Sequence, residues 1–167
     1  MANPFVAYDN IVPVIVPQDI ASTATSSPYV DLRNANKAWF LVCFGLITSA
    51  TTTDREVVTV EAATAEGGTE AAIAFRYRQA GAVGDNTWGA VTTADTTGVS
   101  LAPATDDNVT LLIEIDPDEL AANDYRYARV VLTDTPDMTA CLVAVYAILE
   151  ARYKQTTHIS ATASASA

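Results

Sequence analysis

The chain has 167 residues and a mass of 17.6 kDa; half of its residues are hydrophobic and 17% are charged, so it can build the core of one domain. Its 20 acidic and nine basic residues give a formal charge of −11, which argues against a protein that neutralises nucleic-acid phosphates. The longest apolar runs, Ala38–Ile47 and Ala140–Leu149, are about half the length of a transmembrane helix, and the N-terminus lacks the basic residue of a secretory signal. We therefore expect neither a membrane span nor export.

Residues 1–28 are predicted to form an extended N-terminal arm. Prolines throughout this segment exclude a long helix, although one short edge strand is compatible with Ile11–Val16. The segment Ala21–Ser27 has the composition of a linker. The apolar residues of the arm need burial, either against their own domain or against a neighbouring subunit.

Residues 29–154 are predicted to form an all-β, antiparallel two-sheet sandwich of jelly-roll type. In Ala72–Gln79, for example, Phe75 and Tyr77 alternate with Arg76, which is typical of a half-buried strand. One helical turn is expected at Pro117–Asn123, because Asp116 suits an N-cap. Strands are expected over Tyr29–Leu32, Ala38–Thr48, Glu56–Ala62, Ala72–Gln79, Thr87–Thr93, Val109–Asp116, Asp124–Thr133 and Thr139–Glu150. Residues 155–167 form a low-complexity C-terminal tail of serine, alanine and threonine.

Two of the predicted strands are apolar on both faces. In Ala38–Ile47, Trp39 and Leu41 alternate with Phe40, and Ala140–Leu149 has the same character. A strand of a two-sheet sandwich buries only one face against the core. We therefore expect the second faces to be covered by the N-terminal arm or by another subunit.

Few residues are suited to metal or nucleophilic chemistry. Cys43 and Cys141 lie within the apolar runs and are interpreted as buried thiols, while a bridge between neighbouring strands stays open as an alternative. The single histidine, His158, lies in the tail, so a structural zinc site lacks ligands and a catalytic triad lacks a base. We expect no catalytic residue, no metal site and no cofactor.

Two binding alternatives are weaker. Acidic clusters around Asp106 and Asp116 could attract calcium, but they lack the EF-hand spacing and are better interpreted as turn and helix-cap residues. A sugar-binding platform would require four aromatic residues to share a surface, namely Trp39, Trp88, Tyr125 and Tyr127.

The order of strand patterns resembles that of small virion proteins of tailed bacteriophages. In that group an R-Y-x-R-V-x-L strand precedes a hydrophobic last strand and a short basic-aromatic segment. The matching stretches here are Tyr29–Leu32, Ala38–Ile47, Val57–Ala62, Arg126–Leu132, Leu142–Leu149 and Arg152–Lys154. The resemblance covers strand patterns and not site residues.

This resemblance implies a capsid decoration (cement) protein, a structural protein that is often a homotrimer. The expected partners are the major capsid protein and further copies of the chain on the virion surface, with no nucleic acid and no membrane. The alternatives are a carbohydrate-binding sandwich and a tail or head-fibre component. The expected interface residues are Phe5, Tyr8, Ile11, Val14 and Ile15 in the arm and Tyr153, His158 and Ile159 after the last strand.

Overall fold

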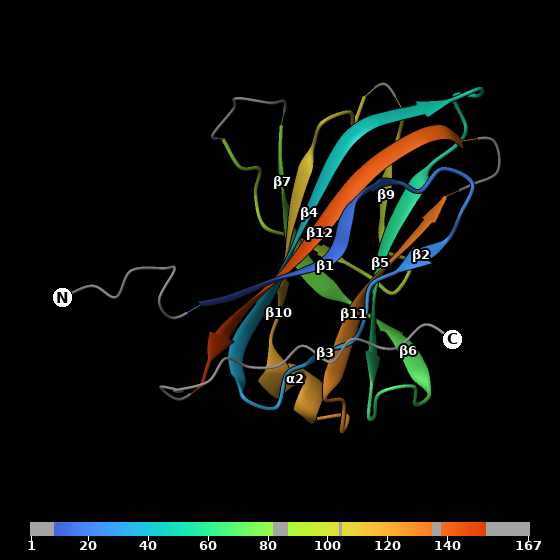
Figure 1. The fold of residues 1–167 in the computed structure, drawn as a ribbon. Coiled ribbons are helices and arrows are strands. Elements are labelled where there is room, and N and C mark those ends of the chain that lie inside the picture. Colours follow the sequence, from blue (N-terminus) through green and yellow to red (C-terminus); the bar gives the residue numbers. More distant parts are fainter. Residues whose placement is uncertain (1–8, 82–86, 104, 135–137, 153–167) are drawn as a thin grey trace.

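The computed structural model describes residues 9–81, 87–103, 105–134 and 138–152. Its strands are β1 (Asp9–Asp19), β2 (Thr25–Ser26), β3 (Val30–Asp31), β4 (Ala35–Ser49), β5 (Glu56–Ala63), β6 (Glu70–Ile73), β7 (Phe75–Ala80), β8 (Thr92–Ala94), β9 (Val99–Leu101), β10 (Thr110–Ile115), β11 (Tyr127–Asp134) and β12 (Met138–Ala151). Sheet A has the order β1-β12-β4-β10-β7-β8 and sheet B the order β2-β11-β5-β6, with β3 beside β11 and β9 beside β5. The two antiparallel sheets confirm the predicted all-β sandwich (Figure 1).

The chain passes repeatedly between the two sheets of the sandwich. It passes from β4 in sheet A to β5 in sheet B, and later from β10 in sheet A to β11 in sheet B and back to β12 in sheet A. Neighbouring strands therefore come from distant parts of the sequence. Leu41 of β4, for example, pairs with Leu112 on one side and with Tyr146 on the other.

The core lies between the sheets and is made of the inward residues of each strand. Phe40 and Val42 of β4 and Leu111 and Ile113 of β10 are at most 1% exposed. Four residues of sheet B in the same cluster are fully buried: Val58, Val60, Val130 and Leu132. The predicted alternation of Val109–Asp116 is thus confirmed.

One short helix, α2 (Pro117–Ala121), closes one end of the sandwich (Figure 1). The Asp116 side chain accepts a hydrogen bond from the Asp118 N–H, and Pro117 occupies the first turn, as predicted. Leu120, a residue of this helix, has a buried side chain. Within the described ranges, no helix is long and apolar enough to cross a membrane.

The segment predicted as an arm is, from Asp9 onward, part of the sandwich. Strand β1 pairs antiparallel with β12 at the edge of sheet A, with register shifts on either side of Ile15. Val14 and Ile15 are buried in the core at 9% and 4% exposure. The arm therefore extends the sheet sideways and does not cover the second apolar face of β4 and β12.

Two other predictions require correction. The strand expected over Thr87–Thr93 is absent from the described residues, where Trp88 forms only an isolated bridge to Ala80 and β8 begins at Thr92. The strand expected over Ala72–Gln79 is divided at Ala74, because β6 pairs in sheet B whereas β7 pairs in sheet A.

Candidate protein-binding face of sheet A

The side of sheet A that points away from the core carries a continuous apolar surface, here called the outer face of sheet A. The register of four strand pairs places its residues in rows across the sheet. One row runs from Ile11 through Ile148 to Trp39, and the next contains Tyr146 and Leu41. The apolar members are Ile11, Pro13, Trp39, Leu41, Cys43, Leu46, Leu112, Leu142, Ala144, Tyr146 and Ile148.

These residues lie on the opposite side of their strands from the core. Phe40 and Val42 are fully buried, while Trp39, Leu41 and Cys43 between and beside them are only half-buried. Among the described residues, no strand or helix forms a further layer over this face. Strand β4 is therefore apolar on both sides, as predicted. One side faces the core and the other lies on the surface.

A β-bulge lies at the end of this face that is farther from α2. Two residues of β4, Gly45 and Leu46, stand opposite the single residue Leu142, between the register pairs Phe44–Val143 and Ile47–Cys141. The extra residue returns Ile47 to the core, at 0% exposure, and leaves Leu46 and Leu142 exposed at 46% and 44%.

Glycine at position 45 suits the bulge because the strands approach closely there. A Cβ atom on Gly45 would lie 3.2 Å from the Leu142 Cβ. The exposed pair Leu46 and Leu142 was not among the predicted interface residues. The one signal for it in the sequence is a glycine inside an otherwise apolar strand, which often marks a bulge.

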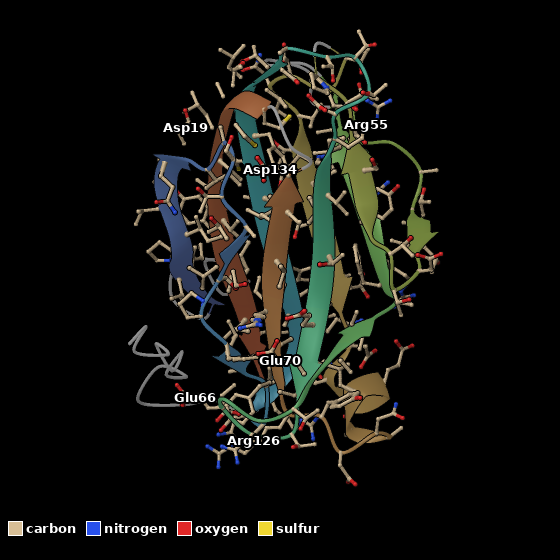
Figure 2. The ribbon with its side chains drawn as sticks, turned by 90° about the vertical axis from the view of Figure 1, so that its right-hand side faces the viewer. Asp19, Arg55, Glu66, Glu70, Arg126 and Asp134 are labelled. Atoms are coloured by element: carbon tan, nitrogen blue, oxygen red, sulfur yellow. The ribbon has the colours of Figure 1, made fainter. Side chains whose placement is uncertain are left out.

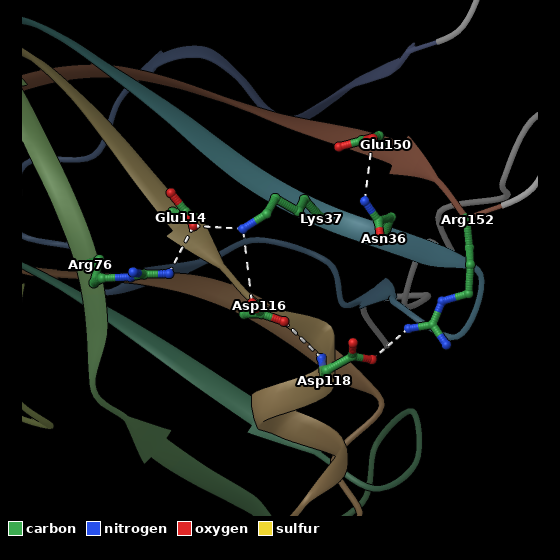
Figure 3. Close-up of polar contacts among 8 residues, drawn as sticks. All are labelled: Asn36, Lys37, Arg76, Glu114, Asp116, Asp118, Glu150 and Arg152. Carbon is green, nitrogen blue, oxygen red and sulfur yellow. Dashed lines mark hydrogen bonds and ion pairs between the residues drawn. The ribbon is translucent and has the colours of Figure 1, made fainter.

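Charged residues border the face at its lower end, near α2 (Figure 3). Lys37 Nζ lies 3.0 Å from Glu114 Oε1, and Arg76 donates to the same oxygen at 2.9 Å. The hydrogen bond that Lys37 donates to Glu114, together with the negative charge of Glu114, raises the pKa of Lys37. These side chains are about one-third to one-half exposed, so the pairs orient the charges more than they stabilise the fold.

Two further polar contacts lie at the same end, and one of them reaches α2. Asn36 donates to Glu150 at 3.3 Å, and Arg152 pairs with Asp118 at 2.7 Å (Figure 3). On the far side of the face, Arg78 of β7 stands in register with Leu112 and donates its Nε–H to the Gly89 carbonyl. The apolar centre is therefore bordered by both signs of charge.

The outer face of sheet B is different, because ion pairs lie across it. Arg129 donates to Glu61 at 2.9 Å and also pairs with Glu70, while its guanidinium lies over the Tyr29 ring at 4.7 Å. Figure 2 shows Glu70 at the lower end of this sheet, in the same region as Arg126. Among the described residues, sheet A therefore has an apolar outer face and sheet B a polar one.

Asp31 anchors a second charged cluster at the lower end of sheet B. Its carboxylate accepts hydrogen bonds from Arg33 and Arg126, with Nη2–Oδ2 distances of 2.7 and 2.8 Å. Burial alone would raise the pKa of Asp31, but the hydrogen bonds from the two arginines outweigh it and hold the pKa well below its usual range.

A cleft of about 570 Å³ opens between the β6–β7 segment and α2. Its lining includes Phe75, Leu120 and Tyr125 together with Arg76 and Glu114. The carboxylates of Asp116 and Glu119 also line it, so the cleft presents mixed polar and apolar surface. In the described part of the chain, no group of three or more His, Cys, Asp or Glu side chains is placed to hold a metal ion.

The predicted interface residues fall into three groups: one on the surface, two in the core and five outside the described ranges. Ile11 lies on the outer face of sheet A and is 47% exposed, whereas Val14 and Ile15 are core residues with little surface for a partner. The alternation along β1 breaks at the register shifts, which is why three apolar residues of one strand have different surroundings. The remaining predicted residues lie outside the described ranges: Phe5, Tyr8, Tyr153, His158 and Ile159.

The four aromatic residues considered for sugar binding do not share one surface. Trp39 lies on the outer face of sheet A, and Trp88 lies beside Ala80 at the β7 edge. Tyr127 is buried against Tyr29, with the rings edge-on at 6.4 Å, and Tyr125 packs against the core. No stacking platform follows from these positions.

The two cysteines are free and belong to different environments. Cys141 is buried in the core, while Cys43 is half-buried on the outer face of sheet A. Burial raises the pKa of both thiols. The interpretation of both as buried thiols is thus confirmed for Cys141 and too strong for Cys43.

No family model matches the chain, and no curated protein matches its sequence.

Proposed function

We propose that this chain is a structural component of a bacteriophage particle, a decoration protein that binds on the capsid surface across subunits of the major capsid protein. The observation that carries the proposal is the outer face of sheet A. A protein that acts as a building block requires such apolar surface, because its partners are other folded proteins. The strand patterns that resemble small phage virion proteins give the second line of support.

The proposed mechanism is stabilisation by linkage. Burying apolar surface contributes about 25 cal/mol per Å², so a face of this size contributes several kcal/mol when a neighbour covers it. A protein that binds only the assembled lattice shifts the assembly equilibrium toward the particle. The net charge of −11 disfavours non-specific association between decorated particles.

Contact with the capsid is assigned to residues at the two ends of the chain, where β1 begins and β12 ends. Phe5 and Tyr8 precede β1, and Tyr153, His158 and Ile159 follow β12. Aromatic residues are enriched at the centres of protein interfaces, which favours Phe5, Tyr8 and Tyr153 as anchors.

The proposal is tested on particles of the virus that encodes the chain. Antibodies against the chain should label the capsid surface at regular spacing in electron microscopy. Deletion of residues 1–8 should reduce particle binding while the circular dichroism spectrum is unchanged. Label confined to the tail or to fibres would replace the decoration role with a tail or head-fibre role, and absence from the particle would reject both.

A further inference from the structure

Glu56, the first residue of β5, is a carboxyl group enclosed in the core. Its side chain is fully buried, and Oε1 has no hydrogen-bond partner among the described residues. Oε2 accepts a hydrogen bond from the Cys141 thiol at 3.7 Å, and a thiol is a weak donor. A buried carboxylate without strong donors is costly, so these surroundings favour the neutral acid.

Asp134, the last residue of β11, stands directly opposite Glu56. The register of β5 with β11 pairs the two acids two residues beyond the core pair Val58 and Leu132, which places both acids on the core side of sheet B. Residues opposite each other in this way have Cβ atoms about 5 Å apart, and like charges there repel. Burial raises the pKa of Glu56, and the charge of Asp134 raises it further. Two carboxylate charges are therefore disfavoured while the two side chains face each other.

The other elements around Glu56 contribute further side chains at this place. Leu101 of β9 pairs with Glu56 on the other side of β5, and Cys141 of β12 contributes a thiol whose pKa is raised by burial. Asp54, two residues before Glu56, is a second buried acid. The neighbouring cation, Arg55, donates to the Asp54 carbonyl at 2.6 Å. Asp134 is thus the charged group that faces Glu56 most directly.

Asp134 also holds the loop that joins the two sheets at the end of the sandwich opposite α2. Residues 20–24 connect β1 of sheet A to β2 of sheet B, and Figure 2 shows Asp19, which precedes this loop, at the same end as Asp134. Ser22 donates its N–H to the Asp134 carboxylate and its hydroxyl to the Met138 carbonyl. The φ angle of Ser22 is 61°, in the left-handed region that is strained for serine. The bond to Asp134 therefore holds a strained residue in place.

The start of this loop is anchored by other groups. The Asp19 carboxylate accepts the Cys141 N–H at 2.9 Å, and Ile20 donates its N–H to the Cys141 carbonyl at 3.0 Å. Hydrogen bonds from the N–H groups of Cys141 and Ala21 lower the pKa of Asp19, so this carboxylate stays ionised near neutral pH. The Ile20 side chain is buried in the core. Ser22 can therefore be released while Ile20 stays bound.

We propose that Glu56 and Asp134 form a clasp on Ser22, which is closed while Glu56 is protonated and opens once Glu56 has released its proton to water. The charge left on Glu56 repels the Asp134 carboxylate, which turns toward solvent and releases the Ser22 N–H. Residues 21–24 then relax from the strained conformation, and water reaches Glu56. The clasp lies outside the outer face of sheet A, so it does not depend on the proposed function.

Hydrogen exchange, followed by NMR at single amides of the full chain, tests the clasp between about pH 6 and pH 8. The protection of the Ser22 N–H, corrected for the intrinsic pH dependence of exchange, should fall by at least about tenfold over this range. Release of one proton changes an equilibrium by up to about tenfold per pH unit. The Ile20 N–H is the internal control, because unfolding of the whole chain would lower both protections equally. Ser22 should therefore lose protection relative to Ile20.

Two variants locate the proton and the opposing charge. Glu56→Gln has no proton to release, so the ratio of the two protections should not change with pH. In Asp134→Asn the amide oxygen can still accept the Ser22 N–H but the repelling charge is gone, so the midpoint of the Ser22 transition should move to higher pH. This second variant tests the clasp even if Glu56→Gln does not fold. As a control, Asp118→Asn removes a carboxylate on α2 and should leave the midpoint unchanged.

Four results overturn the clasp. They are a parallel loss of protection at Ser22 and Ile20, a Ser22 protection that does not depend on pH, a Ser22 transition that persists in Glu56→Gln, and a midpoint that Asp134→Asn leaves in place. Equal shifts for Asp134→Asn and Asp118→Asn would also overturn it, because the net charge of the chain would then set the midpoint. Each of these results leaves the proposed function standing.

Discussion

Glu56 and Cys141 face each other across the core, with Cys141 Sγ donating to Glu56 Oε2 at 3.7 Å. Glu56 is fully buried, and its Oε1 has no hydrogen-bond partner among the described residues. Burial, with the nearby charge of Asp134, raises the pKa of Glu56 to about 7. The folded chain therefore holds a proton that the unfolded chain releases near pH 4.5.

This relationship predicts that stability falls as the pH rises. Between about pH 4.5 and 7 the folded state binds one proton more than the unfolded state, so the free energy of unfolding decreases with pH and levels off above 7. The expected loss is on the order of 3 kcal/mol. Urea unfolding at pH 5, 6 and 7.5 measures it, with Glu56→Gln as the comparison. The variant should lose most of this slope, and an equal slope in both chains would contradict the assignment.

Asp31 predicts the opposite pH dependence at acidic pH. Its pKa is held below the unfolded value, so its contribution is present above about pH 4 and is lost as the pH falls further. Asp31→Asn should destabilise the chain by about 2 kcal/mol at pH 7, because two arginines lose a buried carboxylate partner.

The matched control for this substitution is Asp118→Asn, whose carboxylate pairs with Arg152 but is 78% exposed. Its effect on the free energy of unfolding should stay within about 0.5 kcal/mol. Equal losses for Asp31→Asn and Asp118→Asn in urea unfolding would show that the Asp31 cluster does not stabilise the fold.

Gly67 and Gly98 provide a pair in which the backbone conformation is the same and the surroundings differ. Their φ angles are 71° and 86°, but a Cβ on Gly98 would lie 2.3 Å from the Val58 carbonyl oxygen, whereas one on Gly67 would meet nothing within 4 Å. Gly67→Ala should cost about 1 kcal/mol and Gly98→Ala about 3 kcal/mol or more. Thermal unfolding measures both, and equal costs would contradict the close approach at Gly98.

The different environments of Ile11 and Ile15 predict different effects of truncation. Ile15→Ala should destabilise the isolated fold by about 2–4 kcal/mol, since the side chain is 4% exposed. Ile11→Ala should change the stability of the monomer by less than about 0.5 kcal/mol, since its side chain is 47% exposed. Urea unfolding of the purified chain measures both variants. A large loss for Ile11→Ala would place it in the core.

Because β1 belongs to the sandwich, two deletions of the N-terminal segment should differ in their effect on stability. Removal of residues 1–8 leaves β1 in place, whereas removal of residues 1–20 takes away the edge strand together with Val14 and Ile15. The longer deletion should therefore lower the melting temperature substantially, and the shorter one should not. Equal melting temperatures for the two truncated chains would show that β1 contributes little to the fold.

The sequence was most informative where hydrophobic periodicity is long and regular. Strands β4, β10 and β12 and the cap of α2 followed from alternation and from Asp116, because each pattern is local. The three-residue strand β9 could not be predicted, since its register with β5 depends on a turn that brings Val99 beside Val58. The Thr87–Thr93 prediction failed because β-propensity around Trp88 does not supply a pairing partner.

The candidate face was only partly predictable. Apolar residues on both sides of β4 indicated a second buried surface, but its boundary depends on the bulge at Gly45, which periodicity alone cannot locate. The position of Arg78 at the border of the face depends on the pairing of β7 with β10, which is a long-range property. For the same reason, the sequence could not show that β1 lies beside β12 and not over this face.

The central claim is that a protein neighbour covers the outer face of sheet A, and the two native cysteines test it most directly. Alkylation by N-ethylmaleimide is followed by mass spectrometry in the free chain and in the assembled particle, with the core residue Cys141 as the internal reference. We predict that Cys43 reacts more slowly in the particle than in the free chain, while Cys141 remains unreactive in both. Equal Cys43 rates in the two states would contradict the account.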